Sequence, residues 1–487
     1  MDITKLTPKE VWLQFNEILK VPRPSKHEEK MVEYLVKFAE AHKLEYFVDE
    51  TQNVLIRKSA SKGMEGKPSV ALQAHIDMVC DKEVGSKHNF MKDPIKPIID
   101  GEWVKADKTT LGADDGIGVA VMLAILSSDK IQHGPLECLF TVDEETGLTG
   151  AFGLQEGVLQ SKILLNLDSE DDGQIFIGCA GGIDTVGTFR ITYQKTPPNC
   201  VAYKMSVGGL LGGHSGDDIN KGRGNAIILL NRCIYDYYNE NFLNGLFLAI
   251  ADFSGGNLRN AIARTASATV VVFKEQVAAF ENFVQRYNDM YSDELAKSDP
   301  NVFLKAEKVS GVPRKVLSYS SFDRLTNLLY TMPHGVMSMS FKLEGIVESS
   351  TNLASVNING QEVVVVTSQR SDSDSLKHFL ANKVHACFDN VHALVKHSDG
   401  YPGWTPNEDS HILKVAMNVY KKLFNQDALA CSIHAGLECG LFLQKYPGMD
   451  MISYGPTLRD VHTPQERIHI PTVDKFWKMT LEILKTV

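Results

Sequence analysis

The segment 71–82, A-L-Q-A-H-I-D-M-V-C-D-K, is the part of the sequence that most constrains the fold. The apolar run Val70–Leu72 predicts a buried strand with His75 and Asp77 at its carboxyl end. Side chains alternate along a strand, so His75 and Asp77 share a face and Ile76 points away. An imidazole beside a carboxylate suits a metal ligand with its supporting partner, although H-x-D alone is more often a core histidine at a strand end.

The composition narrows the class of protein. A chain of 487 residues has room for two domains or more, and 43% hydrophobic with 23% charged residues is typical of a globular protein. A net charge of −10 argues against a nucleic-acid partner. The eight cysteines include no C-x-x-C pair, which argues against a disulfide framework or a thiolate zinc site. We see neither a signal-like amino terminus nor an apolar run of membrane length, and therefore expect a cytoplasmic protein.

Strand and helix patterns alternate in the first part of the chain. Strands are expected at 45–58, 69–73, 135–142 and 163–167, and helices at 8–20, 27–43 and 116–127. This alternation predicts an α/β domain with helices packed on a central, mostly parallel sheet.

A different pattern follows from about residue 182. Paired alternating strands with intervening helices occur twice, which predicts a large α+β insertion with two similar halves. The Y-P-G-W segment at 401–404 ends the insertion, and α/β character then returns. We expect one α/β domain in two parts, 1–184 and 399–487, interrupted by an insertion at 185–398.

Further acidic and imidazole residues stand where predicted strands or loops end. These are Asp114 with Asp115, the run Asp143–Glu145, Asp168, and His462 after a strand at 451–454. Sites in open α/β sheets form beyond the carboxyl ends of the strands, so these side chains and His75 should converge. Such a group of acids is costly to bury unless a cation holds it.

The predicted ligand set consists of nitrogen and oxygen donors only. It suits zinc, with cobalt or manganese as alternatives, and two ions fit if one carboxylate bridges them. Of the neighbours Glu144 and Glu145, one can then bind metal while the other acts as a general base.

Each piece has a simpler explanation when it is taken alone. Asp143–Glu145 could be a solvated acidic turn, Asp168 part of an acidic surface loop, and His462 an exposed loop histidine. The glycines at 112–118 could suggest a dinucleotide loop, but Val121 replaces the third glycine of G-x-G-x-x-G. The joint order and placement of the residues favour a metal site.

Several longer motifs extend the pattern over nearly the whole chain. They are V-P-R-P-S-K-H-E at 21–28, Q-A-H-I-D-M-V at 73–79, L-G-A-D-D-G-I-G at 111–118, D-E-E-T-G at 143–147, N-L-D at 166–168, G-G-H-S-G at 212–216, I-H-A-G-L-E-C-G at 433–440 and H-T-P-Q-E-R at 462–467. With these motifs the chain resembles the zinc metallopeptidases of the aminoacylase, carboxypeptidase-G and dipeptidase family. Within that family it is most similar to the Xaa-His dipeptidase branch, also called aminoacyl-histidine or cytosol non-specific dipeptidases.

The resemblance implies a set of metal ligands. Asp114 would bridge two divalent ions, most simply zinc. His75 and Asp168 would hold one ion, and Glu145 and His462 the other. It also implies a zinc-peptidase-like catalytic domain, with the insertion as its lid domain, and a possible homodimer.

The resemblance also implies three catalytic residues. Asp77 would orient His75, and Glu144 would carry a proton from water to the leaving amine. His214, in the lid, would stabilise the oxyanion of the tetrahedral state. In dimeric relatives that histidine reaches the partner's site, whereas a doubled lid could supply it within the chain.

Three further residues are candidates for substrate binding. Asn352 and Arg370 could grip the terminal carboxylate of a dipeptide, a role that suits the fork of an arginine. His434 stands before a glycine-rich helix start, where anions are favoured. The alternatives are a surface ion pair for Arg370 and a structural cap for His434.

The sequence thus predicts a two-metal hydrolase of unblocked dipeptides, including Xaa-His dipeptides of the β-Ala-His type. An aminotripeptidase or an N-acyl amino acid deacylase could use the same metals. A non-catalytic metal-binding homologue is the alternative from another class, but the presence of Glu144 and Asp77 speaks against it.

Overall fold

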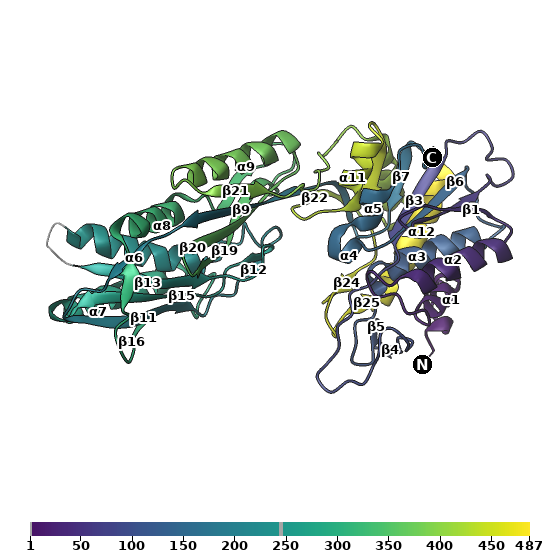
Figure 1. Ribbon diagram of the computed structural model, residues 1–487. Coiled ribbons are helices and arrows are strands. Elements are labelled where there is room, and N and C mark those ends of the chain that lie inside the picture. The colour runs from purple at the N-terminus through teal and green to yellow at the C-terminus, as the bar shows by residue number, and fades with distance from the viewer. Residues whose placement is uncertain (1, 243–246) are drawn as a thin grey trace. The chain divides into compact units, whose positions relative to one another are not determined.

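The computed structural model describes residues 2–242 and 247–487, which form two compact units (Figure 1). The first unit comprises Met1–Gly178, Trp404–Ser432 and Leu437–Val487, and the second Cys179–Gly403 and Ile433–Gly436. The insertion expected at 185–398 therefore lies within the second unit, whose ends extend a few residues further.

The short segment Ile433–Gly436 corrects the expected domain boundaries. We expected it in the closing α/β part at 399–487, but it belongs to the second unit. The backbone N–H of Ala180 donates to the carbonyls of both Ile433 and Ala435, at 3.0 Å each. These bonds tie the segment to the first residues of the second unit.

The first unit is built on an eight-stranded sheet. In spatial order its strands are β1 (Glu45–Val48), β2 (Val54–Lys58), β6 (Leu136–Thr141), β3 (Val70–His75), β7 (Ile163–Asn166), β23 (Asp450–Ser453), β8 (Gln174–Cys179) and β22 (Leu429–Ile433). The four central strands, from β6 to β23, are parallel as predicted. Antiparallel pairs flank them, β1–β2–β6 on one side and β23–β8 on the other.

Helices pack on this sheet and on one another. They are α1 (Lys9–Ile18), α2 (Glu29–Ala41), α3 (Ala113–Leu126), α4 (Glu144–Gly147), α5 (Thr149–Gly153), α10 (His411–Phe424), α11 (Glu438–Lys445) and α12 (Ile470–Thr486). Helix α3 is apolar on all sides and lies between α1 and strand β3. Val11, Trp12, Phe15 and Ile18 recur at helical spacing in α1 and are fully buried. Each such side chain contributes about 1.5 to 3 kcal/mol by leaving water.

A smaller four-stranded sheet completes the first unit. It joins β4 (Pro97–Asp100) and β5 (Trp103–Ala106) to β25 (Arg467–His469) and β24 (Leu458–Arg459), near the carboxyl terminus. This sheet is not predicted by the sequence patterns, because its strands are only two to four residues long. It fixes the chain on both sides of His462, because β24 and β25 flank that residue.

The second unit contains one larger sheet, most of whose strands belong to two halves of identical topology. The first half is β11 (Cys200–Gly208), α6 (Ala226–Phe242), β13 (Leu248–Gly255), β15 (Ala266–Phe273), α7 (Val277–Glu294) and β16 (Phe303–Lys308). The second half is β9 (Gly181–Arg190), α8 (Tyr319–Thr331), β19 (Val347–Asn359), β20 (Glu362–Ser371), α9 (Asp374–Asp389) and β21 (Leu394–His397).

Both halves arrange their strands in the same spatial order. The sheet runs β16–β11–β15–β13–β19–β20–β9–β21, so the fourth, first, third and second strands of each half follow one another from the outside inwards. The second strands meet at the join, where Ser254 faces Asn357 and Gly255 faces Val356 in an antiparallel pair. The two similar halves expected from the sequence are therefore present in the topology.

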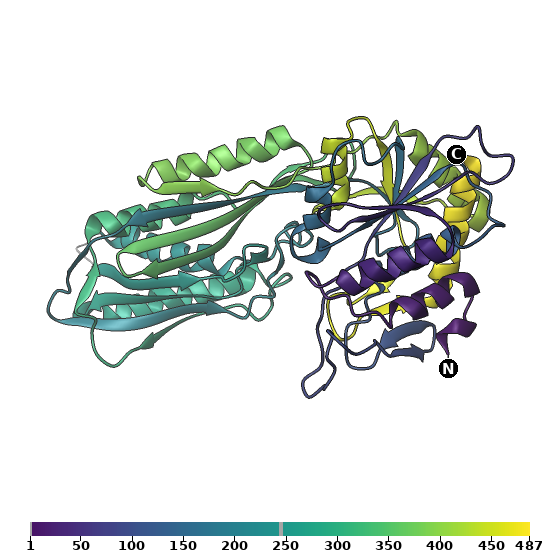
Figure 2. The same ribbon diagram turned by 45° about the vertical axis from the view of Figure 1, so that its right-hand side comes forward.

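Shorter strands and the helices complete the second unit. Strand β18 (Gly335–Met339) pairs with β19, and two small pairs are formed by β10 (Tyr193–Lys195) with β17 (Lys315–Leu317) and by β12 (Gly213–His214) with β14 (Ala261–Ile262). Figure 2 shows the helices of this unit lying along its sheet. Within residues 2–242 and 247–487, none of the helices combines the length and apolar character needed to cross a bilayer.

Candidate metal centre

The parallel register of the first unit brings its strand ends to one edge. His75 faces Thr141 across β3 and β6, and Asn166 faces both Gln73 on β3 and Ser453 on β23. The segments that follow these strands therefore begin next to one another. They carry the acidic and imidazole residues expected to converge.

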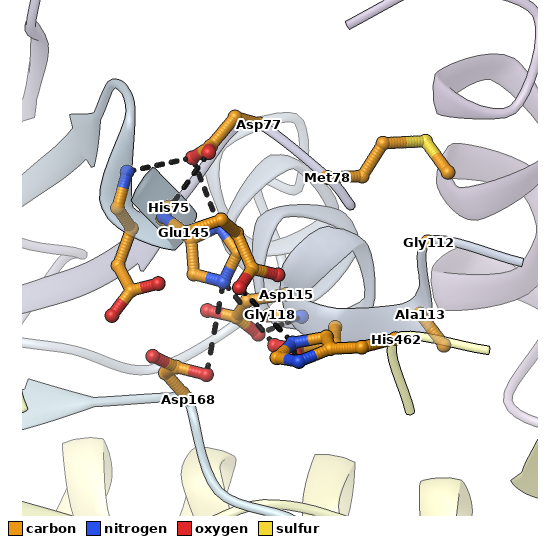
Figure 3. Close-up of polar contacts among 12 residues, drawn as sticks. His75, Asp77, Met78, Gly112, Ala113, Asp115, Gly118, Glu145, Asp168 and His462 are labelled. Carbon is orange, nitrogen blue, oxygen red and sulfur yellow. Dashed lines mark hydrogen bonds and ion pairs between the residues drawn. The ribbon is translucent and has the colours of Figure 1, made fainter. Parts of the chain in front are cut away.

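His75 lies at the centre of the resulting cluster. Its Nδ1 lies 3.2 Å from Asp77 Oδ1, while its Nε2 lies 3.2 Å from Asp114 Oδ1 and 3.9 Å from Asp168 Oδ1 (Figure 3). Burial disfavours a charged imidazole, but Asp168, Asp114 and Asp77 outweigh it and raise the His75 pKa well above its usual value. With Asp77 on one ring nitrogen, the other is directed at two carboxylates.

Asp114 connects two histidines through its two oxygens. Oδ1 lies 3.2 Å from His75 Nε2 and Oδ2 lies 3.1 Å from His462 Nε2. Burial alone would raise the Asp114 pKa, but hydrogen bonds from His462 and His75 lower it far below its usual value. The residue stands in a non-helical stretch at the start of α3, with φ −82° and ψ 114°. A carboxylate shared in this way is suited to bridging two cations.

Glu145 completes the group around His462. Its Oε2 lies 3.0 Å from His462 Nε2, and its side chain is only 5% exposed. Its Oε1 is buried and has no hydrogen-bond partner within the described residues. The contacts with Asp114 and Glu145 outweigh burial and raise the His462 pKa to about 11.

The turn that carries Glu144 and Glu145 is held by two other carboxylates. Asp77 accepts the N–H of Glu144 at 3.0 Å and that of Glu145 at 3.3 Å. Asp143 is buried in a left-handed conformation and accepts the hydroxyls of Thr146 and Thr149. The structure therefore rules out a solvated turn at 143–145. Burial raises the Glu144 pKa well above its usual value.

The donor set fits divalent cations. One ligand atom each of His75, Asp114 and Glu145 lie within 4.8 Å of one another, and Asp168 and His462 flank them. Burial, together with the negative charge of Asp114, raises the Asp168 pKa well above its usual value. The acids of the cluster therefore disfavour one another's ionisation. An unpartnered buried oxygen and neighbouring carboxylates that resist ionisation together mark a place where positive charge is needed.

The second unit gathers the predicted lid residues His214 and Arg370. Arg370 Nη1 donates to the Tyr401 hydroxyl at 2.9 Å, its Nη2 lies 3.4 Å from His214 Nε2, and its Nε lies 3.4 Å from Ser215 Oγ. The arginine is only 7% exposed, and no carboxylate of the described chain forms an ion pair with it. The predicted alternative, a surface ion pair, is therefore wrong. His214 itself pairs with Asp217, with Nδ1 3.1 Å from Oδ2.

The other two substrate candidates have supporting contacts. Asn352 is 1% exposed, and its Nδ2 donates to the carbonyls of Ala261, at 2.9 Å, and Arg259, at 3.4 Å. His434 is 7% exposed, with Nε2 2.7 Å from Ser350 Oγ. No side chain caps α11, so His434 is not a helix cap. Burial and the nearby Arg370 lower the His434 pKa to about 4, which keeps its imidazole neutral.

Sequence reasoning missed three buried charged residues near the metal centre. Glu438 accepts Gln73 Nε2 at 2.6 Å and Thr141 Oγ1 at 2.9 Å, directly beside the strand ends. Arg23 and Glu466 bind the backbone of the loops that carry the ligands. All three lie inside motifs that support the family resemblance, but a charged residue in a sequence motif gives no indication that its side chain is buried.

The comparisons with known proteins agree with this architecture. A model of peptidase family M20/M25/M40 matches residues 71–486, from the strand that leads to His75 to the last helix. The chain belongs to this peptidase family. The resemblance inferred from the sequence motifs is thereby confirmed.

Relatives of this peptidase match over its whole length. It is 41% identical over 486 residues to the cytosol non-specific dipeptidase of Escherichia coli (strain K12). The match covers 100% of this chain and 99% of the relative. It is also 41% identical to the aminoacylhistidine dipeptidase from Vibrio alginolyticus, whose crystal structure matches with a TM-score of 0.91 over 100% of this chain and 98% of that one. The structure of aminopeptidase PepT from Bacillus cereus shares the fold at 17% identity, with a TM-score of 0.63 over 99% of this chain and 98% of that one.

Proposed function

We propose that this peptidase is a cytoplasmic dipeptidase that hydrolyses unblocked dipeptides, including Xaa-His dipeptides, with two divalent metal ions. The bridging position of Asp114 between His75 and His462 is the observation that carries the metal part of the proposal. The names of the two relatives at 41% identity, a cytosol non-specific dipeptidase and an aminoacylhistidine dipeptidase, support the substrate class and the compartment.

The distances within the cluster support the proposed ligands. His75 and Asp168 would hold one ion, Glu145 and His462 would hold the other, and Asp114 would contact both. Zinc is the ion that this mixture of imidazole and carboxylate suits best, and cobalt or manganese can take its place. When bound, such ions polarise the scissile carbonyl and lower the pKa of the attacking water.

Glu144 is the proposed proton carrier. It accepts a proton from the attacking water on its carboxylate and delivers that proton to the leaving amine. A glutamate can carry out both steps, because its carboxylate accepts a proton and its carboxylic acid donates one. Its position is set by Asp77, which accepts the Glu144 backbone N–H at 3.0 Å.

Asp77 has two positioning roles in this proposal. Its contact with His75 Nδ1 leaves Nε2 as the metal-binding atom. Through the N–H groups of Glu144 and Glu145 it also fixes the turn that supplies the base and one ligand.

The second unit supplies the proposed groups for substrate charge. Arg370 binds the carboxylate of the dipeptide, since no carboxylate of the described residues forms an ion pair with its buried guanidinium. His214 stabilises the oxyanion. The two lie together within the second unit, with Arg370 Nη2 3.4 Å from His214 Nε2. Asn352 donates to the carbonyl of Ala261 on β14, the strand that pairs with the strand of His214. His434 contacts Ser350, which faces Arg370 across β19 and β20.

The test is a substrate series with metal-free enzyme and with zinc, manganese or cobalt added back. The substrates are β-Ala-His, Gly-His, a tripeptide and an N-acetyl amino acid. Metal-dependent cleavage of the two dipeptides alone supports the proposal. Cleavage of the tripeptide or the blocked amino acid would instead identify an aminotripeptidase or a deacylase. Stoichiometric metal without turnover would identify a non-catalytic homologue. The homodimer implied by the resemblance is tested separately, by light scattering.

A further inference from the structure

One buried carboxylate accepts the backbone N–H groups of the short segment 111–114, which ends in Asp114. Glu466 is 2% exposed. Its Oε2 accepts the N–H groups of Leu111 at 2.7 Å and Gly112 at 2.9 Å, and its Oε1 accepts those of Ala113 at 2.7 Å and Asp114 at 3.3 Å. A carboxylate offers about four acceptor positions, so these backbone amides use the whole group.

Glu466 also belongs to the segment that carries His462. Its own N–H donates to the carbonyl of Thr463 at 3.0 Å, which closes the turn after His462. One side chain therefore links the backbone around Asp114 to the turn that follows His462. These are the two residues whose side chains lie 3.1 Å apart at the metal centre.

A buried arginine donates to a backbone carbonyl of the same segment. Arg23 is 2% exposed, and its Nη2 donates to the carbonyl of Gly112. Its Nη1 donates to the carbonyls of Ile76 at 3.1 Å and Asp77 at 2.6 Å. The planar fork thus ties the end of strand β3, which carries His75, to the segment that carries Asp114.

Gly112 makes this arrangement possible. Its φ of +70° is left-handed, and a Cβ at this position would lie 2.6 Å from Arg23 Nη2. The guanidinium therefore occupies the space that a side chain would need. A glycine both adopts the required backbone conformation and lets the arginine approach.

The charges are unusual for a merely structural contact. Among the described residues, Arg23 is the only buried lysine or arginine of the first unit. Burying a charge is costly unless partners satisfy it, and Arg23 is attracted by Asp77, Glu466 and Asp114 together. A buried cation and a fully used carboxylate thus meet on opposite sides of one four-residue segment.

We propose that Arg23 and Glu466 are paired positioning residues that fix the backbone of residues 111–114, and so aim both oxygens of Asp114, before any metal ion binds. The inference rests on the proposed function only in that Asp114 is taken as the bridging ligand. A ligand whose backbone is already fixed loses less conformational freedom when the ions bind, so the pair raises metal affinity.

The test compares Glu466→Gln and Arg23→Lys with a matched control, all in the full-length chain. The glutamine leaves one NH2 facing backbone donors, and the lysine keeps the charge but loses the fork. The control is Glu137→Gln. Glu137 is also buried, and its Oε2 accepts the N–H groups of Gln160 and Ser161 at 2.8 Å each. It lies near the start of β6, away from the strand end beside His75.

Two readouts are measured without any peptide substrate. The first is hydrogen–deuterium exchange of the metal-free protein over residues 111–114. The second is zinc affinity, from competition with a chromophoric chelator. We expect both positioning variants to exchange faster at 111–114 and to bind zinc about 10- to 100-fold more weakly. Glu137→Gln should exchange faster only around 160–161 and keep wild-type zinc affinity.

The proposal is overturned if the folded variants keep wild-type zinc affinity, or if exchange at 111–114 does not change. It is also overturned if Glu137→Gln weakens zinc binding equally, because the effect would then be one of general stability. If Glu466→Gln does not fold, the same two readouts for Arg23→Lys decide whether the proposal holds. Because neither readout requires turnover, a protein that fails to cleave dipeptides could still pass this test.

Discussion

His462 Nε2 lies 3.1 Å from Asp114 Oδ2, although 348 positions separate these residues in the chain. The other oxygen of Asp114 lies 3.2 Å from His75 Nε2. One carboxylate therefore joins three segments of the first unit, including one from each side of the insertion. The metal centre can form only when both parts of that unit have folded together, so metal binding and folding of the unit are coupled.

Glu144→Gln tests the assignment of the base. Glutamine has nearly the same shape but cannot accept a proton, so we expect turnover to fall about 100- to 10,000-fold. Metal content should stay at the wild-type level, because Glu144 is not a proposed ligand. Steady-state kinetics together with metal analysis of the same sample check this. Full turnover in the variant would remove Glu144 from the mechanism.

Asp77→Asn tests the support of His75. The asparagine loses the charge that holds His75 Nδ1–H, and we expect zinc affinity to fall about 10- to 100-fold. The matched control is Asp49→Asn. Asp49 is also buried and accepts three N–H groups from Thr51 and Asn53, outside the metal centre. Chelator competition on both variants separates the two cases, and equal losses would contradict the assignment.

Arg370→Lys tests carboxylate binding by the second unit. Lysine keeps the charge but not the fork, and a hydrogen bond to a charged group contributes about 1.5 to 3 kcal/mol. We therefore expect KM for dipeptides to rise about 10- to 100-fold, with metal content unchanged. Tyr401→Phe removes only the hydroxyl that accepts from Arg370 at 2.9 Å, and should raise KM less. An unchanged KM in Arg370→Lys would show that another group binds the carboxylate.

Glu438→Gln tests the pH dependence of the buried acid beside the strand ends. Burial raises the Glu438 pKa from 4.5 to about 7. The folded state thus holds a proton that the unfolded chain releases between these pH values, so stability falls as pH rises through that window. The change is on the order of 3 kcal/mol, at 1.36 kcal/mol for each pKa unit.

Glutamine mimics the neutral acid at every pH. The metal-free variant should therefore match the wild type near pH 5 and be more stable than it near pH 8. Urea unfolding at both pH values measures the difference. Metal-free protein is used because bound cations would lower the Glu438 pKa again. A difference between variant and wild type that does not change with pH would contradict the raised pKa.

The convergence of the acidic and imidazole residues could be predicted because strand ends can be recognised in the sequence. The apolar run before His75, the strand before Asp143 and the strand before Asp168 each end at the same edge once the sheet is parallel. The doubling of the second unit was also visible, because strand and helix patterns recur in the same order.

The supporting residues could not be predicted in this way. Arg23, Glu466 and Glu438 are charged, and charged residues are mostly exposed, so the sequence alone favours the surface for each of them. Their burial depends on partners far away in the sequence, such as the amides of residues 111–114 for Glu466. The assignment of Ile433–Gly436 to the second unit depends likewise on two hydrogen bonds from Ala180.

The central claim is that this chain hydrolyses dipeptides with two metal ions held around Asp114. The most direct measurement is β-Ala-His hydrolysis by metal-free enzyme during a titration with zinc, with bound metal counted at each step. We predict no turnover without metal and activity that rises until two ions are bound per chain. Turnover without metal, or full activity at one ion per chain, would contradict the account.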